Sequence, residues 1–351
     1  MRVERFVLGH RPPTDLAGAV LARDLRVGTE RWAKGRRLTA VDLATLAAAD
    51  PVAVGVDEVT LIVPEEDDLH EDDAALRLAT AVAGPGLERR GPSESRVDLV
   101  SAVDGVLHVR VREVELLDRI DPLEVFTALD GSVVGAGQLV ASVKVAPHVV
   151  PSSVVEAGVR ITQSGRRPLV WVAPFRPMRV AILVKESLRA ADRARFENSV
   201  RDKVESLGST ITRFVYVPDQ AAAVSEALGS LTRGPDAVDV VLTAGGRSTD
   251  PGDPFFVALE ELRGRLIRRG VPAHPGSMLW LGRIGRSAVL GLPTCGAYSK
   301  ATAADLLLPR LLTGEPPSLR TVSRLGHGGI LTRDMRFRFP TYARRLEAPE
   351  G

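Results

Sequence analysis

The sequence has very little cysteine and no long apolar run. A single cysteine, Cys295, excludes an internal disulfide and any metal site built from several cysteines. No apolar run approaches the length of about 18 residues that a membrane-spanning helix needs, and no apolar signal-peptide core stands near the start. We therefore expect a cytoplasmic protein that does not enter a membrane.

The chain also lacks an excess of charge of either sign. Its 46 basic side chains nearly balance 44 acidic ones, so no global field attracts nucleic acid or an anionic membrane surface. With 44% hydrophobic and 26% charged residues, the 351-residue chain has the composition of folded domains and the length for two or three of them. Any recognition of an anion must come from a local site.

The region 1–174 mixes short strand-like and helical patterns, which predicts an α+β or β region. Within it, residues 107–116 alternate between apolar and polar and predict a half-buried strand. The acidic stretch 64–73 has two interpretations. Its hard ligands for a metal ion are Asp68, His70, Asp72 and Asp73. The favoured interpretation is that these carboxylates complement the dipole of the next helix and keep the surface solvated.

The region 178–314 predicts a three-layer α/β domain. Buried-strand runs at 179–184, 210–217 and 238–243 alternate with helical patterns, an order that requires a mainly parallel sheet with right-handed crossovers. Ligands of such sheets bind outside the carboxyl ends of the strands. A basic tail, 315–351, follows. We expect it to pack beside the domain or against a second subunit, and the alternative is that its arginines grip a phosphate or pterin.

A glycine-rich turn follows the third of these strands, at Gly245 and Gly246. Glycine lets backbone amides approach an anion, and the N-terminus of the next helix adds partial positive charge. Asp253 is a suitable N-cap for that helix, because Pro254 fits its first position, and the apolar spacing extends the predicted helix to Gly270. A hairpin over 278–292 and a last helix over 299–312 complete the region.

These motifs resemble the molybdopterin-binding domain shared by the molybdotransferases and adenylyltransferases of molybdenum cofactor synthesis. The molybdotransferase turn reads T-S-G-G-x-S-x-G-x-x-D. The matching residues here are Thr243, Gly245, Gly246, Ser248 and Asp253. A later P-G pair and a G-L-P loop are matched by Pro275, Gly276, Gly291, Leu292 and Pro293. The chain departs from the pattern at the third glycine, which is Asp250, and at Thr294, Cys295 and Gly296, which replace G-N-P.

A less characterised bacterial group with this domain is more similar. It carries a P-G-N-L-L-L-L-G-R-L-G hairpin, a D-x-x-D turn and an S-P-K-like loop. The corresponding parts here are the run 275–285, the pair Asp250 and Asp253, and Ser299 with Lys300.

The resemblance implies a small-molecule pterin ligand, molybdopterin or its adenylylated or metal-loaded form. The implied binding residues are Lys185, Glu186, Thr243, Gly245, Gly246, Arg247, Ser248, Pro275, Gly276, Pro293, Thr294, Cys295, Ser299 and Lys300. Lys185 would neutralise a ligand phosphate, with a solvated loop lysine as the equally weighted alternative. In a molybdotransferase-like enzyme, Asp250 and Asp253 would be catalytic and hold Mg²⁺.

The alternative function is a noncatalytic carrier or chaperone that passes the finished cofactor to a molybdoenzyme apoprotein. Cys295 would then be a transient molybdenum ligand, although a lone cysteine is more often a small apolar filler. Domains of this kind usually form dimers or trimers, so a homo-oligomer is expected. A nucleotide-binding dehydrogenase does not fit, because the first strand of the α/β domain runs into residues 184–188 and not into a G-x-G-x-x-G motif.

Overall fold

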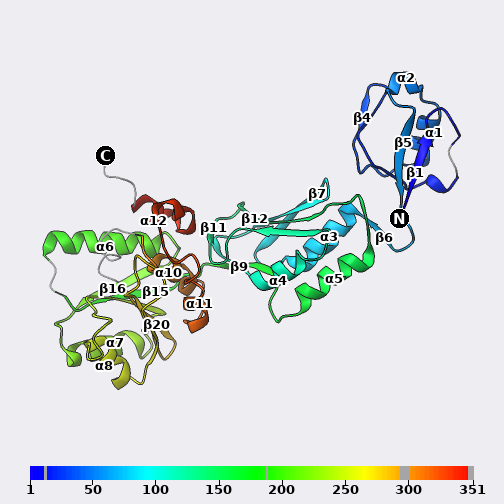
Figure 1. Cartoon of the computed structure of the whole chain (residues 1–351). Coiled ribbons are helices and arrows are strands. Elements are labelled where there is room, and N and C mark those ends of the chain that lie inside the picture. The colour runs from blue at the N-terminus through cyan, green and yellow to red at the C-terminus, as the bar shows by residue number, and fades with distance from the viewer. Residues whose placement is uncertain (12–13, 187–188, 293–300, 347–351) are drawn as a thin grey trace. The chain divides into compact units, whose positions relative to one another are not determined.

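The computed structural model describes residues 1–11, 14–186, 189–292 and 301–346 (Figure 1). The chain divides into two compact units. The N-terminal unit comprises residues 1–103, 108–130 and 135–172, and the C-terminal unit comprises residues 104–107, 131–134 and 173–351. Among the helices that the structure describes, none has the length and apolarity that a membrane crossing requires.

The N-terminal unit begins with a small antiparallel sheet in the order β1-β5-β2. Its elements are β1 (Arg2–Val7), η1 (Thr14–Leu16), β2 (Val20–Leu21), the hairpin β3 (Leu25–Val27) and β4 (Glu30–Trp32), α1 (Ala40–Ala47), α2 (Pro51–Val54) and β5 (Glu58–Val63). Alternate residues of β5 are buried, among them Val59, Leu61 and Val63, and they pack with Leu43 and Leu46 of α1. This period-two burial is what a strand with one covered face requires.

The rest of the N-terminal unit is built on a four-stranded antiparallel sheet in the order β10-β12-β8-β7. Its strands are β7 (Leu87–Ser93), β8 (Arg96–Ser101), β10 (Leu123–Thr127) and β12 (Leu139–Val145). The helices are α3 (Glu71–Val82), α4 (Val111–Leu117) and α5 (Ser152–Gln163), and the short pair is β6 (Asp68–His70) with β13 (Val149–Pro151). A three-stranded sheet joins β11 (Val133–Val134), β9 (Gly105–Val109) and β14 (Val170–Pro174), of which residues 105–107, 133–134 and 173–174 belong to the C-terminal unit.

The predicted strand over residues 107–116 is wrong in its second half. The strand β9 ends at Val109, and α4 begins at Val111. The same sequence also places Val111, Val114 and Leu117 at helical spacing, and Leu117 is fully buried. An alternating run of this length is compatible with both structures, and packing of Leu117 selects the helix.

The acidic stretch serves local structure around the start of α3. Glu71, Asp72 and Asp73 occupy the first turn of that helix, where carboxylates complement the helix dipole. The His70 ring accepts a hydrogen bond from the Asp72 amide at 3.1 Å and so caps the helix. The Asp68 carboxylate lies 2.6 Å from the N-terminal amine. These contacts support the interpretation of the stretch as a helix start.

The C-terminal unit confirms the predicted α/β class and its mainly parallel sheet. The strand order is β16-β15-β17-β20-β19-β18. The strands are β15 (Arg179–Val184), β16 (Thr210–Tyr216), β17 (Val240–Ala244), β18 (Arg265–Arg269), β19 (Trp280–Ile284) and β20 (Ser287–Gly291). Strands β16, β15, β17 and β20 run parallel, whereas β19 is antiparallel to β20 and to β18. The strand before the glycine turn, β17, is therefore central in the sheet.

Helices cover both faces of this sheet, which gives the three layers (Figure 1). The helices are α6 (Ala190–Glu205), α7 (Ala221–Thr232), α8 (Pro254–Glu261), α10 (Ala304–Leu312), α11 (Leu319–Ser323), η2 (Arg333–Arg338) and α12 (Thr341–Leu346). Phe196 of α6 shares a buried cluster with Leu307 of α10 on one face, and Leu228 of α7 shares another with Phe255 of α8 on the other. Phe339 and Tyr342 of the tail belong to the first cluster. The tail thus packs against its own domain.

The helix predicted to run to Gly270 ends earlier. Helix α8 stops at Glu261, Arg263 has a φ of +53°, and β18 follows from Arg265. A Cβ at Gly264 would lie 2.8 Å from Ile284 Cγ1, so this corner tolerates only glycine without a shift. Leu266, which continued the helical spacing, pairs with Gly282 in the sheet. Adding an edge strand to the β19–β20 hairpin overrides the local helical pattern.

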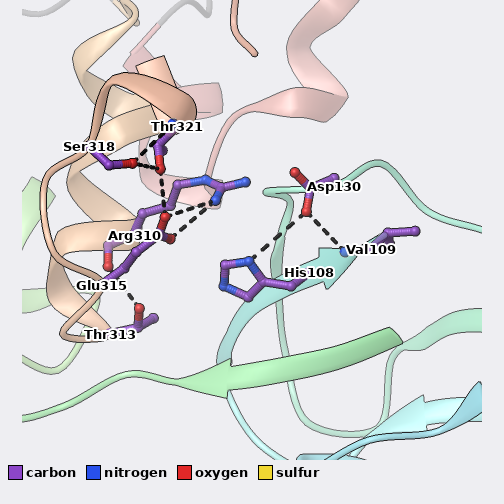
Figure 2. A network of polar contacts seen from close by, with 8 residues as sticks. All are labelled: His108, Val109, Asp130, Arg310, Thr313, Glu315, Ser318 and Thr321. Carbon is purple, nitrogen blue, oxygen red and sulfur yellow. Dashed lines mark hydrogen bonds and ion pairs between the residues drawn. The ribbon is translucent and has the colours of Figure 1, made fainter. Parts of the chain in front are cut away.

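Polar groups hold turns in each unit outside the predicted site (Figure 2). In the C-terminal unit, the Glu315 carboxylate accepts hydrogen bonds from Arg310 Nη1 at 3.1 Å and Thr321 Oγ1 at 2.7 Å. In the N-terminal unit, Asp130 Oδ1 lies 4.0 Å from His108 Nδ1. The Glu315 contacts join the end of α10 to the start of α11.

Candidate functional site

The predicted site residues that the structure describes gather largely at the carboxyl ends of the parallel strands. Lys185 and Glu186 follow β15, and the turn of residues 245–248 follows β17. Register brings these ends together, because Val184 pairs with Tyr216 of β16 on one side and with Ala244 of β17 on the other. This edge of the sheet is where ligands of parallel sheets bind.

The glycine turn is tightly packed. Gly245 has a φ of +84°, a conformation that side chains disfavour, and a Cβ there would lie 3.1 Å from the Glu186 Cβ. A Cβ at Gly246 would lie 3.2 Å from Phe255. The Thr243 hydroxyl, at the end of β17, is buried without a hydrogen-bond partner among the described residues. The two glycines are thus needed for the turn to lie against the Lys185 loop and α8.

Asp253 ties this turn to the start of α8. Its Oδ1 accepts a hydrogen bond from the Phe255 amide at 2.9 Å, which is the predicted N-cap contact. Its Oδ2 accepts a second hydrogen bond from the Arg247 amide at 2.7 Å. The carboxylate is 1% exposed. Asp253 therefore holds both the helix start and the glycine turn in place.

Lys185 is buried between two carboxylates. Its Nζ lies 2.8 Å from Asp253 Oδ2 and 2.6 Å from Asp219 Oδ1, and its side chain is 1% exposed. The Phe255 ring lies beside the ammonium group, with its centroid 5.4 Å from Nζ. This burial contradicts the interpretation of Lys185 as a solvated loop lysine, and it shows that the ammonium group faces protein carboxylates.

Asp219 also belongs to the candidate site, although no sequence motif predicted it. It lies just beyond β16, and besides Lys185 it faces Arg247, whose Nη2 is 3.9 Å from Asp219 Oδ2. A signal was present in the sequence, because Asp219 stands three residues after the end of β16, and the carboxyl ends of parallel strands share one sheet edge. Asp219, Asp253, Lys185 and Arg247 together carry no net formal charge.

Asp250 has a different environment from the buried Asp253. It is exposed, and its Oδ1 accepts a hydrogen bond from the Gly252 amide at 2.8 Å, so it forms a local turn. Within the described ranges, no group of three or more His, Cys, Asp or Glu side chains is arranged to hold a metal ion. Both carboxylates that the sequence predicts as Mg²⁺ ligands, Asp250 and Asp253, accept hydrogen bonds from protein amides.

Pro275 and Gly276 lie beside the start of α10. Gly276 is buried with a φ of +107°, and a Cβ there would lie 2.7 Å from the Ala303 amide nitrogen. Asp305 Oδ2 accepts a hydrogen bond from the Thr302 amide at 2.8 Å in the same place. The predicted residues that fall outside the described part of the chain are Pro293, Thr294, Cys295, Ser299 and Lys300.

Gly291 lies next to the site, at the end of β20. It pairs with Trp280 across the hairpin, and a Cβ at this position would lie 1.9 Å from the indole Nε1. We expect Gly291→Ala to lower the free energy of unfolding by about 1–3 kcal/mol, because the indole must shift in a packed core. Urea unfolding followed by circular dichroism measures this. The double variant Gly291→Ala, Trp280→Phe should lose less than the sum of its single variants, and strict additivity would contradict the clash.

Residues 186–313 match the family model described as a probable molybdopterin binding domain. All the matched residues lie in the C-terminal unit. The match confirms the resemblance found in the sequence, and it includes Asp219, the glycine turn and Asp253, whereas Lys185 stands one residue before it.

Several solved structures that are similar to this chain are described as molybdopterin or molybdenum cofactor biosynthesis proteins. The molybdopterin biosynthesis enzyme MoaB from Thermus thermophilus is 23% identical, with coverage of 40% of this chain and 98% of that one and a TM-score of 0.30. The molybdopterin biosynthesis protein MoeA from Pyrococcus horikoshii is 15% identical, with coverage of 74% of this chain and 81% of that one and a TM-score of 0.30. No curated protein matches the chain.

Proposed function

We propose that this chain binds molybdopterin, in its free, adenylylated or metal-loaded form, in the biosynthesis, insertion or delivery of the molybdenum cofactor. The observation that carries the proposal is the glycine turn at the carboxyl end of the central parallel strand, inside the probable molybdopterin binding domain. A turn of this kind beside a helix N-terminus suits the phosphate of such a ligand. The exposed guanidinium group of Arg247 adds a donor that suits phosphate oxygens.

The proposed function is ligand binding and not catalysis. A molybdotransferase-like step through Mg²⁺ on Asp250 and Asp253 would have to displace the contacts that these carboxylates make with the protein. A carrier needs no such step. We therefore propose a binding protein that passes the pterin to another component, a molybdoenzyme apoprotein or a second enzyme of the pathway, and that acts as a homo-oligomer.

Mass spectrometry of the full chain purified from a molybdate-fed host tests the ligand. The expected result is a molybdopterin species bound to the native protein and released on denaturation. A protein that carries no pterin, and takes up none when molybdopterin is added, would contradict the proposal.

The glycine turn provides a second test. We expect Gly245→Ala to weaken molybdopterin binding by roughly tenfold, because an alanine at a φ of +84° strains the turn. The matched control is Gly234→Ala. Gly234 has a similar φ of +78° with open space around it, and it lies after α7, away from the site. Equal pterin affinity of the two variants would show that the turn does not contribute to pterin binding.

A further inference from the structure

Lys185 occupies a position that a metal ion would need. Its ammonium group is within hydrogen-bond distance of one oxygen of Asp219 and one of Asp253, and it is buried with one of these two carboxylates. The carboxylates come from loops after β16 and β17, so Lys185, after β15 between them, bridges all three parallel strands. The chain therefore supplies a cation of its own to this pair of acids.

We propose that Lys185 replaces a divalent cation in this site, so that the chain binds its phosphate-bearing ligand without Mg²⁺. This inference takes the identity of the ligand from the proposed function. The poor fit of a metal ion to this site follows from the contacts of Lys185 and Asp253 alone. It makes Lys185 a positioning residue, which holds Asp219 and Asp253 together and leaves Arg247 to meet the ligand.

The donor set supports this assignment. Mg²⁺ requires oxygen ligands in near-octahedral geometry and usually keeps several waters. Asp253 already accepts three contacts, from Lys185, Arg247 and Phe255, and the Phe255 ring closes one side of the ammonium group. A divalent ion bound to the same carboxylates would also lie close to the Lys185 charge, which repels it. These residues do not fit Mg²⁺.

The charges of the surrounding groups also fit an anionic ligand. Without Lys185, the two carboxylates would repel a phosphate and would need an external cation. With Lys185 in place and Arg247 beside Asp219, the four groups are formally neutral. Arg247 is the exposed member, with 72% of its side chain accessible, so it is the group that a phosphate can reach.

Titration of the full chain with Mn²⁺, followed by electron paramagnetic resonance, tests the inference without any pterin. Wild type should bind Mn²⁺ at this site no better than the variant Asp219→Asn. Lys185→Met should gain affinity for Mn²⁺ by roughly tenfold or more, because the repelling charge is gone and the carboxylates are freed. The gain should disappear in Lys185→Met, Asp219→Asn.

Two outcomes of the Mn²⁺ titration overturn the inference. One is tight Mn²⁺ binding by wild type that Asp219→Asn abolishes, a result that stands even if Lys185→Met fails to fold. The other is a folded Lys185→Met variant with unchanged Mn²⁺ affinity.

Molybdopterin binding to wild type, measured with EDTA and then with excess Mg²⁺, separates the two proposals. Equal affinity supports both, binding only with Mg²⁺ overturns this inference alone, and no binding in either condition overturns the proposed function.

Discussion

Replacement of Asp305 by alanine is expected to lower the free energy of unfolding of the C-terminal unit by about 3–5 kcal/mol, because it leaves a buried ammonium group without its counter-charge. Asp305 Oδ1 lies 2.5 Å from Lys203 Nζ, and the two side chains are 0% and 1% exposed. The Tyr342 ring lies beside the same lysine, with its centroid 5.5 Å from Nζ. The loss should also free the Thr302 amide, which Asp305 holds at the start of α10.

Urea unfolding followed by Trp280 fluorescence measures this effect in one unit. The chain has three tryptophans, so Trp32 and Trp171 are first replaced by phenylalanine to leave Trp280 as the reporter in the C-terminal unit. The control is the double variant Lys203→Met, Asp305→Leu. It should lose less stability than Asp305→Ala, since apolar replacement of both partners removes the uncompensated charge and leaves only the loss of the Thr302 hydrogen bond. A single variant that loses less than about 1 kcal/mol would show that Lys203 finds water or another partner.

Asp253→Asn is expected to lower the free energy of unfolding by about 2–4 kcal/mol and to weaken pterin binding by an order of magnitude or more. From the sequence, asparagine is a good replacement for aspartate at an N-cap, so little change in stability is expected. The structure changes this expectation. Asp253 accepts hydrogen bonds on both oxygens, and the amide nitrogen of asparagine would face either the Phe255 amide or the Arg247 amide with Lys185.

A double-mutant cycle with Lys185→Met identifies the cause. If the cost of Asp253→Asn comes from the buried ion pair, the two substitutions should be strongly non-additive. Additive costs would show instead that the N-cap and the turn carry the whole effect. Pterin affinity, measured on the same four proteins, reports whether the turn keeps its shape. Metal-dependent turnover of adenylylated pterin by wild type would favour the transferase over the carrier, whatever the stability of the variant.

Much of the C-terminal unit could be predicted because its signals are local. The runs at 179–184 and 238–243 are apolar and bounded by turns, and the structure places them as neighbouring parallel strands in the core of the sheet. Asp253 before Pro254 predicted a capped helix start, which the structure confirms. Where a pattern fitted two structures, the prediction from local spacing was wrong. Residues 111–117 and 265–269 each took the structure that their neighbours in space required.

The sequence by itself determined the parallel sheet, the position of the glycine turn and the kind of domain, because glycine placement and strand burial depend on residues adjacent in the chain. Only the tertiary structure decided where the Lys185 side chain lies. Its charge looked available to a ligand, but pairing of Val184 with both Tyr216 and Ala244 brings three strand ends together and buries the ammonium group between Asp219 and Asp253. The Lys185 side chain can be buried only because these carboxylates pair with it, since a buried charge without a partner costs too much free energy.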